Sequence, residues 1–135
     1  YDRPASRYVA DFVGKSNFFD GRIERLDGST AKLVGPGGTI FVGHANEGLG
    51  SDQPATASLR PEQISLTRDA GGLPVTVVNR IFLGEHTEYL VRNPDLGPFL
   101  VLASRQAEAG THNFEPGETG YASWREGAAL ILSKD

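Results

Sequence analysis

The sequence predicts an all-β chain, built as a tandem repeat of two small barrels or half-barrels of about five strands each and preceded by a short helix. The first observation is that the pattern of residues 57–66 returns at residues 122–132, where small and large apolar residues again alternate with Ser and Arg. The second observation is that the chain of 135 residues contains 17 Gly and 8 Pro, with few long helical periodicities. Such a composition is typical of short strands joined by many turns.

A short amphipathic helix is expected within residues 1–16. Its apolar positions fall at helical spacing: Tyr8, Val9, Phe12 and Val13. Pro4 suits the first turn and Gly14 suits the C-cap position. A helix of this length is marginal alone, so its apolar face needs a partner, either a part of a longer protein or the core of this domain. Because the chain begins with Tyr1 and contains no Met, we expect it to be a piece of a longer protein.

The first repeat is expected to span residues 17–72. A hairpin with its turn at residues 27–28 comes first, and a tight Gly- and Pro-rich turn at residues 35–38 leads to a third strand at residues 39–42. A longer loop and a fourth strand follow. The alternation of apolar and polar residues in these segments predicts strands with one buried face.

The second repeat is expected to span residues 73–135 and to follow the same order. A hairpin with its turn at residues 83–85 precedes a strand at residues 98–103, and a later strand leads into Trp124. Trp124 alternates with Ala122, which favours burial, but an amphipathic ring on a late strand also suits an interface. Both interpretations of Trp124 remain open.

Charge and composition exclude several classes of function. The formal net charge is −4 and the pI is about 5.3, which disfavours a binder of nucleic-acid phosphates because such proteins cluster Lys and Arg. The chain contains no Cys, so it has neither disulfides nor thiolate metal ligands, in keeping with a cytoplasmic protein. No apolar run reaches the roughly 18 residues that a membrane span needs, so we expect neither a membrane-spanning helix nor a signal peptide in this sequence.

No catalytic, cofactor or metal site is predicted. The sequence at residues 35–38 lacks the Lys and the helix of a phosphate-binding loop, and no Ser, His and Asp combination has a local signature. His44, His86 and His112 are far apart in sequence, with His44 and His112 expected in polar loops. A metal site would need all three to converge by chance, so we interpret them as surface residues.

Arg60 and Glu62 are the candidate ligand or regulatory residues. They flank Pro61, which suits the first position of a single helical turn because the missing N–H group has no partner there. An Arg fork beside the open N-terminus of that turn can hold an oxyanion. Alternatively, Arg60 pairs with a carboxylate and Glu62 caps the turn; this structural interpretation is the favoured one.

These motifs together resemble a known family. Tyr1 and Pro4, followed by the segment 7–14 and Asn17-Phe18-Phe19, resemble the part of bacterial ABC-importer ATPase subunits that leaves the nucleotide-binding domain. Leu59-Arg60-Pro61-Glu62-Gln63-Ile64 resembles the Arg-Pro-Glu motif of their regulatory domain, the transport-associated OB (TOBE) domain. Leu83-Gly84, Tyr89-x-Val91 and Trp124 with Leu130-Ile131-Leu132 resemble its second half. The similarity is strongest to importers of polyamines, ferric iron and thiamine.

The resemblance implies tandem OB-like barrels that act as a non-catalytic regulatory and dimerisation domain. Residues 1–16 would be the linker helix from the nucleotide-binding domain, which would bind ATP and Mg²⁺ outside this chain. The implied partners are that domain, a second copy of the chain and a membrane permease, at the cytoplasmic face of the membrane.

Two alternatives come from other classes of protein. One is a small oxyanion-binding domain of the molybdate type. The other is an OB-type oligonucleotide binder that stacks bases on aromatic side chains, namely Phe18, Phe19, Phe41 and Tyr89. The acidic sequence offers no basic groove for the second alternative.

Overall fold

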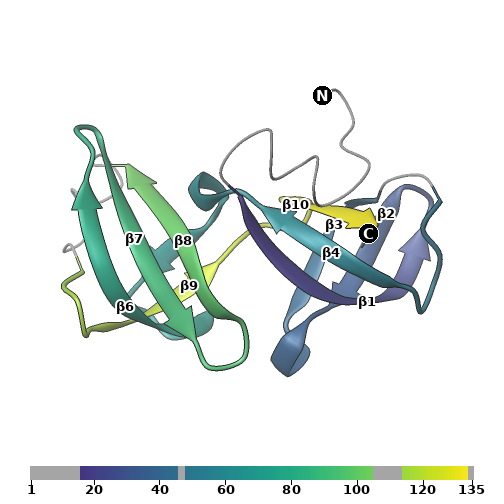
Figure 1. Cartoon of the computed structure of the whole chain (residues 1–135), viewed down its shortest axis with the longest axis horizontal. Helices are drawn as coiled ribbons and strands as arrows, with labels where there is room; N and C mark the ends of the chain where they lie inside the picture. Colours follow the sequence, from purple (N-terminus) through teal and green to yellow (C-terminus); the bar gives the residue numbers. More distant parts are fainter. Residues whose placement is uncertain (1–15, 46–47, 105–113, 134–135) are drawn as a thin grey trace. The chain divides into compact units, whose positions relative to one another are not determined.

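The computed structural model describes residues 16–45, 48–104 and 114–133. These residues form ten strands and two single turns of 3-10 helix, which confirms the prediction of an all-β chain (Figure 1). The helix predicted within residues 1–16 lies outside the described residues, apart from Ser16. Among the described residues, no helix is long and apolar enough to cross a membrane.

Two compact units divide the chain. One, called the barrel unit here, consists of the residues up to Arg60 together with those from Arg125 onward, and the other, the sheet unit, is Pro61–Trp124. Each unit contains five of the strands.

The barrel unit is a closed barrel with the strand order β1-β2-β3-β10-β4. Its elements are β1 (Asn17–Asp27), β2 (Thr30–Val34), the turn η1 (Pro36–Gly38), β3 (Ile40–Ala45), β4 (Pro54–Leu59) and β10 (Ala129–Ser133). β10 closes the barrel because it pairs in parallel with β3 and antiparallel with β4. The interior is filled by alternate residues of the strands, and the rings of Phe19 and Phe41 stack there at 5.0 Å between centroids.

The sheet unit is an open five-stranded sheet with the order β5-β9-β6-β7-β8. Its elements are η2 (Pro61–Gln63), β5 (Ser65–Thr67), β6 (Leu73–Phe82), β7 (His86–Asn93), β8 (Gly97–Ser104) and β9 (Thr119–Ser123). The helical turn predicted at Pro61 and the hairpin predicted around residues 83–85 are thus both present. The buried face is lined by β-branched and aromatic residues: Val75, Val77, Tyr89, Val91, Phe99, Val101 and Phe114.

Backbone hydrogen bonds show that the two units repeat one another. The register shifts after Ile23 in β1 and again after Val77 in β6. The backbone N–H of Ile23 donates to the carbonyl of Gln53 (2.9 Å), just before β4. In the same way, the N–H of Val77 donates to the carbonyl of Glu118 (2.9 Å), just before β9. Leu59 ends β4, whereas Trp124 lies just outside β9 and follows its last residue directly.

Each unit contains one strand that belongs, by its place in the sequence, to the other repeat. β5 follows β4 in the chain but pairs with β9 in the sheet unit, whereas β10 follows β9 but pairs with β4 in the barrel unit. The predicted halves, residues 17–72 and 73–135, follow the order of the repeats along the sequence. The compact units differ from those halves because the chain changes unit after Arg60 and again after Trp124.

Candidate functional site

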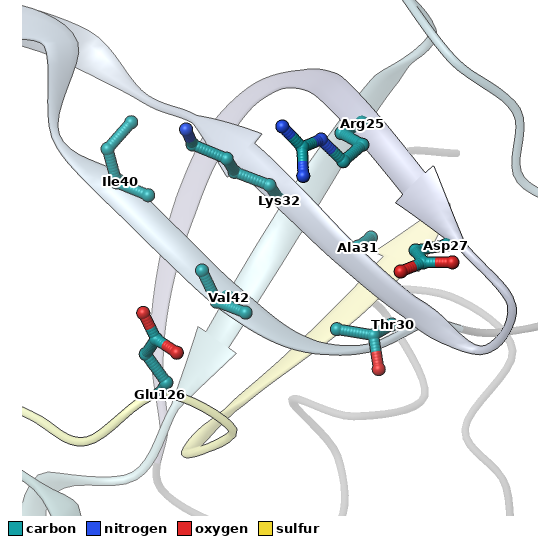
Figure 2. Close-up of a pocket in the computed structure, with 8 residues that line it drawn as sticks. All are labelled: Arg25, Asp27, Thr30, Ala31, Lys32, Ile40, Val42 and Glu126. Atoms are coloured by element: carbon teal, nitrogen blue, oxygen red, sulfur yellow. The ribbon is translucent and has the colours of Figure 1, made fainter.

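A shallow hollow of about 380 Å³ lies on the outer face of the barrel unit. Its lining comes from β1, β2, β3 and the turn before β10: Arg25, Asp27, Thr30, Ala31, Lys32, Ile40, Val42 and Glu126 (Figure 2). The face points outward because Leu33 and Phe41, the strand neighbours of these residues, are buried in the barrel.

Strand register assembles the hollow from residues that are apart in sequence. Arg25 pairs with Lys32 across β1 and β2, and Lys32 pairs with Val42 across β2 and β3. Two cations and an apolar side chain therefore form a row across three strands. The backbone N–H of Gly127 donates to the carbonyl of Val42 (2.9 Å), which holds the turn that carries Glu126 against β3.

The charges of the hollow are mixed and open to water. Lys32 Nζ lies 3.0 Å from Glu24 Oε1, and 37% and 53% of the two side chains are exposed. A pair of this exposure contributes at most about 1 kcal/mol. Figure 2 shows Arg25 and Lys32 side by side, with Asp27 and Glu126 apart from them. The hollow can therefore offer charged and apolar contacts to a partner, and its lining shows no paired nucleophile and base.

The residues predicted from sequence as a site do not line this hollow. Arg60 is exposed at the end of the barrel unit, and Glu62 is exposed in η2 of the sheet unit, beside the buried Pro61. Trp124 is half-buried after β9. Their role as ligand, regulatory or interface residues stays a prediction.

The positions of the histidines differ in part from the sequence-based expectations. His44 is exposed, but it lies in β3 and not in a loop, while His86 is exposed at the start of β7. His112 lies outside the described residues. The described residues contain no cluster of three or more His, Cys, Asp or Glu side chains that can hold a metal ion.

Three of the four rings suggested as a stacking surface for an oligonucleotide binder are buried, and the fourth, Phe18, is half-buried. Phe19, Phe41 and Tyr89 are at most 4% exposed, because alternation directs them into the cores of the two units. Bases cannot stack on rings that water does not reach.

A second cluster of charges, in the sheet unit, is built around the Arg68–Glu118 pair. Arg68 Nη1 and Nη2 donate to the two carboxylate oxygens of Glu118 at 3.1 and 3.2 Å. This hydrogen bonding, and next to it the backbone N–H of Glu115 at 2.7 Å, lowers the pKa of Glu118 below its ordinary value. The same contact raises the pKa of Arg68.

These charges hold Phe114, which is 4% exposed. The guanidinium of Arg68 lies 4.3 Å from the ring centroid of Phe114, and Tyr89 meets the ring edge-on at 6.0 Å. Arg80 Nη1 donates to the Phe114 carbonyl (2.7 Å) and lies 3.1 Å from Glu115 Oε2. The cluster therefore fixes a core residue of the sheet unit, and we do not take it as a ligand site.

Comparison with protein families decides the identity of the chain. The model of the TOBE domain matches residues 57–132. The chain belongs to the TOBE domain family. This confirms the resemblance seen in the Arg60-Pro61-Glu62 motif and in the residues from Trp124 to Leu132, which fall within the matched region.

Curated relatives of this TOBE domain are longer proteins. It is 35% identical over 134 residues to the spermidine/putrescine import ATP-binding protein PotA 1 of Pseudomonas aeruginosa, and 32% identical over 136 residues to PotA of Rubrobacter xylanophilus. Each alignment covers 98% of this chain and 35% of the relative. The chain thus spans about a third of the length of these relatives.

A solved structure shows the same fold. The cytoplasmic molybdate-binding protein ModG, in a molybdate-bound form, matches with a TM-score of 0.72, over 87% of this chain and 95% of that one. The sequence identity is 14%, so the likeness extends to the fold alone.

Proposed function

We propose that this TOBE domain is the regulatory module of the ATP-binding subunit of an ABC importer and contributes no catalytic group itself. The observation that carries the proposal is the alignment of 98% of the chain with one third of PotA 1 at 35% identity. The remaining two thirds of such a subunit would bind ATP and Mg²⁺ and hydrolyse ATP.

The names of the relatives favour spermidine and putrescine as the solutes that the parent subunit imports. Its partners would be the nucleotide-binding domain of the parent, a membrane permease and a second copy of the subunit. The protein would then lie in the cytoplasm, on the inner face of the membrane. The exposed, mixed-charge hollow around Arg25 and Lys32 suits a contact between proteins better than a buried reaction site.

A chimera tests the proposal. The part of PotA 1 that aligns with this chain is replaced by residues 1–135, and ATP-driven spermidine uptake is measured in cells that lack PotA 1. We expect the chimera to restore uptake that depends on spermidine concentration as in the natural protein. A chimera that accumulates and assembles with the permease, but imports no better than PotA 1 truncated at the same point, would contradict the proposal.

Titration of the isolated chain with ATP and with molybdate tests its own ligands. The lack of a phosphate-binding loop in the sequence predicts no ATP binding at micromolar concentration. Only the likeness in fold to ModG favours molybdate binding by this chain. We therefore expect no tight molybdate complex either. Micromolar affinity for ATP would overturn the non-catalytic assignment, and tight molybdate binding would favour the oxyanion-binding alternative.

The proposal includes a weak self-association of this domain. A regulatory contact that forms and separates during transport should be of standard size and mixed polarity, and the ATP-bound domains would raise its effective concentration in the full subunit. The isolated chain should therefore be monomeric at low micromolar concentration and dimerise only when concentrated. Sedimentation velocity checks this: a dimer at nanomolar concentration, or a monomer at millimolar concentration, would contradict it.

A further inference from the structure

The hollow on the barrel unit contains an unfavourable arrangement of charge. Arg25 and Lys32 occupy directly opposed positions of β1 and β2, and their side chains lie side by side on the outer face (Figure 2). Like charges that face each other across two strands destabilise a sheet. Lys32 has an acidic partner, because its Nζ atom lies 3.0 Å from Glu24 Oε1. The stability of the barrel therefore does not account for the second cation, Arg25.

The side chain of Arg25 has no partner in the part of the chain that the structure describes. It forms neither an ion pair nor a hydrogen bond there, and the two carboxylates of the lining, Asp27 and Glu126, lie apart from it (Figure 2). By contrast, Arg22 on the same strand donates through Nη1 to the carbonyl of Asp52 (2.7 Å). The guanidinium donors of Arg25 are therefore available to a ligand.

The sheet unit shows that the fold does not require these charges. Both units have a register shift in their first hairpin. Counted from that shift, Asn79 and Leu90 occupy in the sheet unit the places that Arg25 and Lys32 occupy in the barrel unit. The third place of the row, on the next strand, is apolar in both units. The same bulged strand pair thus forms with neutral residues, so the two cations need an explanation other than the fold.

Part of the lining is apolar. Ile40 is 39% exposed and Val42 is half-buried, and both line the hollow. Val42 pairs with Lys32 across β2 and β3, so an aliphatic surface begins directly beside the cations. An occupant that places a carboxylate on Arg25 can at the same time remove an aliphatic side chain from water against Ile40 and Val42.

The carboxylates around the hollow disfavour a polyanion. Asp27 and Glu126 line the hollow, and Glu24 is held beside it by Lys32. A nucleic acid or a surface of anionic lipid would bring further negative charges against these side chains, which costs binding energy. A protein segment can instead supply one carboxylate with uncharged neighbours.

We propose that the hollow docks a segment of a partner protein that presents one carboxylate beside an aliphatic side chain. Arg25 and Lys32 bind the carboxylate, and Ile40 and Val42 contact the aliphatic group. The strands under the hollow are paired on both sides within the closed barrel, so side chains recognise the partner and no strand is added to the sheet. The inference takes from the proposed function only that this hollow is a contact between proteins. A peptide assay does not measure transport, so its failure leaves the test of uptake by the chimera unaffected.

Titration with a model peptide tests the docking. The probe is a blocked peptide of sequence Gly-Ser-Leu-Glu-Leu-Ser-Gly, added to the isotope-labelled full chain, and the amide chemical shifts of β1, β2 and β3 are followed by NMR. We expect saturable shifts around the hollow. The affinity should fall at least about tenfold when Gln replaces the Glu of the peptide, or when Ser replaces both Leu residues. No saturable shift at millimolar peptide, or equal binding of the three peptides, would overturn the proposal.

Two variants of the chain locate the contact. Arg25→Gln should weaken binding of the probe at least about tenfold, whereas Arg22→Gln, which removes the same charge from the same strand, should change it less than about twofold. Equal losses would indicate a general effect of charge and would contradict the proposal. Because Arg25 faces a like charge, Arg25→Gln should leave the urea midpoint unchanged or raise it. A clear fall in the midpoint would mean that Arg25 serves the fold instead.

Other anions provide the remaining comparison. Acetate, inorganic phosphate and a short single-stranded oligodeoxynucleotide should each shift the same amides less than the peptide does at equal concentration. Equal shifts with acetate or phosphate would make the hollow a site for small anions. Tighter binding of the oligonucleotide would make it a contact for nucleic acid. Either result would overturn the assignment of a protein partner.

Discussion

In the barrel unit β10 closes the sheet by pairing in parallel with β3, whereas in the sheet unit β5 pairs with β9 and the sheet stays open. The two units otherwise share the same three-stranded meander and the same bulge. Closure therefore depends on the exchanged strand. β10 has five residues and pairs with two neighbours, while β5 has only three residues.

Two glycines and one Phe account for the difference between the closed barrel and the open sheet. A Cβ at Gly43 would overlap the backbone oxygen of Ala129, so the close approach of β3 and β10 requires glycine. In the sheet unit, a Cβ at Gly120 would meet the ring of Phe114 at 2.9 Å. Backbone pairing thus completes one core, and the Phe114 side chain helps to complete the other.

The largest expected effect follows from removing that side chain. Phe114→Ala should lower the free energy of unfolding by about 3–5 kcal/mol, the usual loss for a buried Phe. Urea denaturation of the full chain measures it. Phe82→Ala is the matched control, because Phe82 is 54% exposed and should cost under about 1 kcal/mol. Similar losses in both variants would show that Phe114 does not support the sheet unit.

Gly43→Ala tests closure of the barrel unit. The added methyl group must push β10 away from β3, and overpacking of this kind costs about 1–3 kcal/mol. Gly50→Ala is the control, since the nearest atom to its Cβ would be Gln53 Oε1 at 3.7 Å. Urea denaturation measures the loss in the free energy of unfolding. The rate of amide exchange in β10 should rise only in Gly43→Ala. Unchanged exchange in β10 would mean that its pairing with β3 does not close the barrel.

The smallest expected effect concerns the Arg68–Glu118 pair. Because folding lowers the pKa of Glu118 below its ordinary value of 4.5, the pair adds stability above pH 4.5 that is lost as the pH falls through the folded pKa. Glu118→Gln should lower the stability of the fold at neutral pH. It should also reduce the fall in stability that occurs as the pH drops below 4.5. Urea midpoints near neutral pH and below pH 4.5 measure the change. The exposed Glu85, changed to Gln, is the control, and an identical acid dependence in both variants would exclude the pair as its source.

Much of the fold could be predicted because local patterns specify it. Gly and Pro marked the turns at residues 35–38 and 83–85, alternation marked the strands, and Pro61 marked the helical turn. The family resemblance rested on short motifs such as Arg60-Pro61-Glu62. These signals all act within a few residues of the chain.

Pairing between distant strands could not be predicted in the same way. The alternation in β5 and β10 shows that each has a buried face, but it does not specify which strand lies beside it. The hollow around Arg25 and Lys32 depends on that register, so no local sequence motif predicts it. Phe114 also gave no signal, because its partners Tyr89 and Arg80 are distant in sequence.

The exchange of β5 and β10 has a consequence for how such a gene can change. A duplication that produced two independent copies could later lose either one and leave a complete domain. Here the deletion of either copy, residues 17–72 or 73–135, would take a strand from the unit that remains: β5 from the sheet unit or β10 from the barrel unit. Selection must therefore retain both copies together, even where only one of them carries a contact that the cell uses.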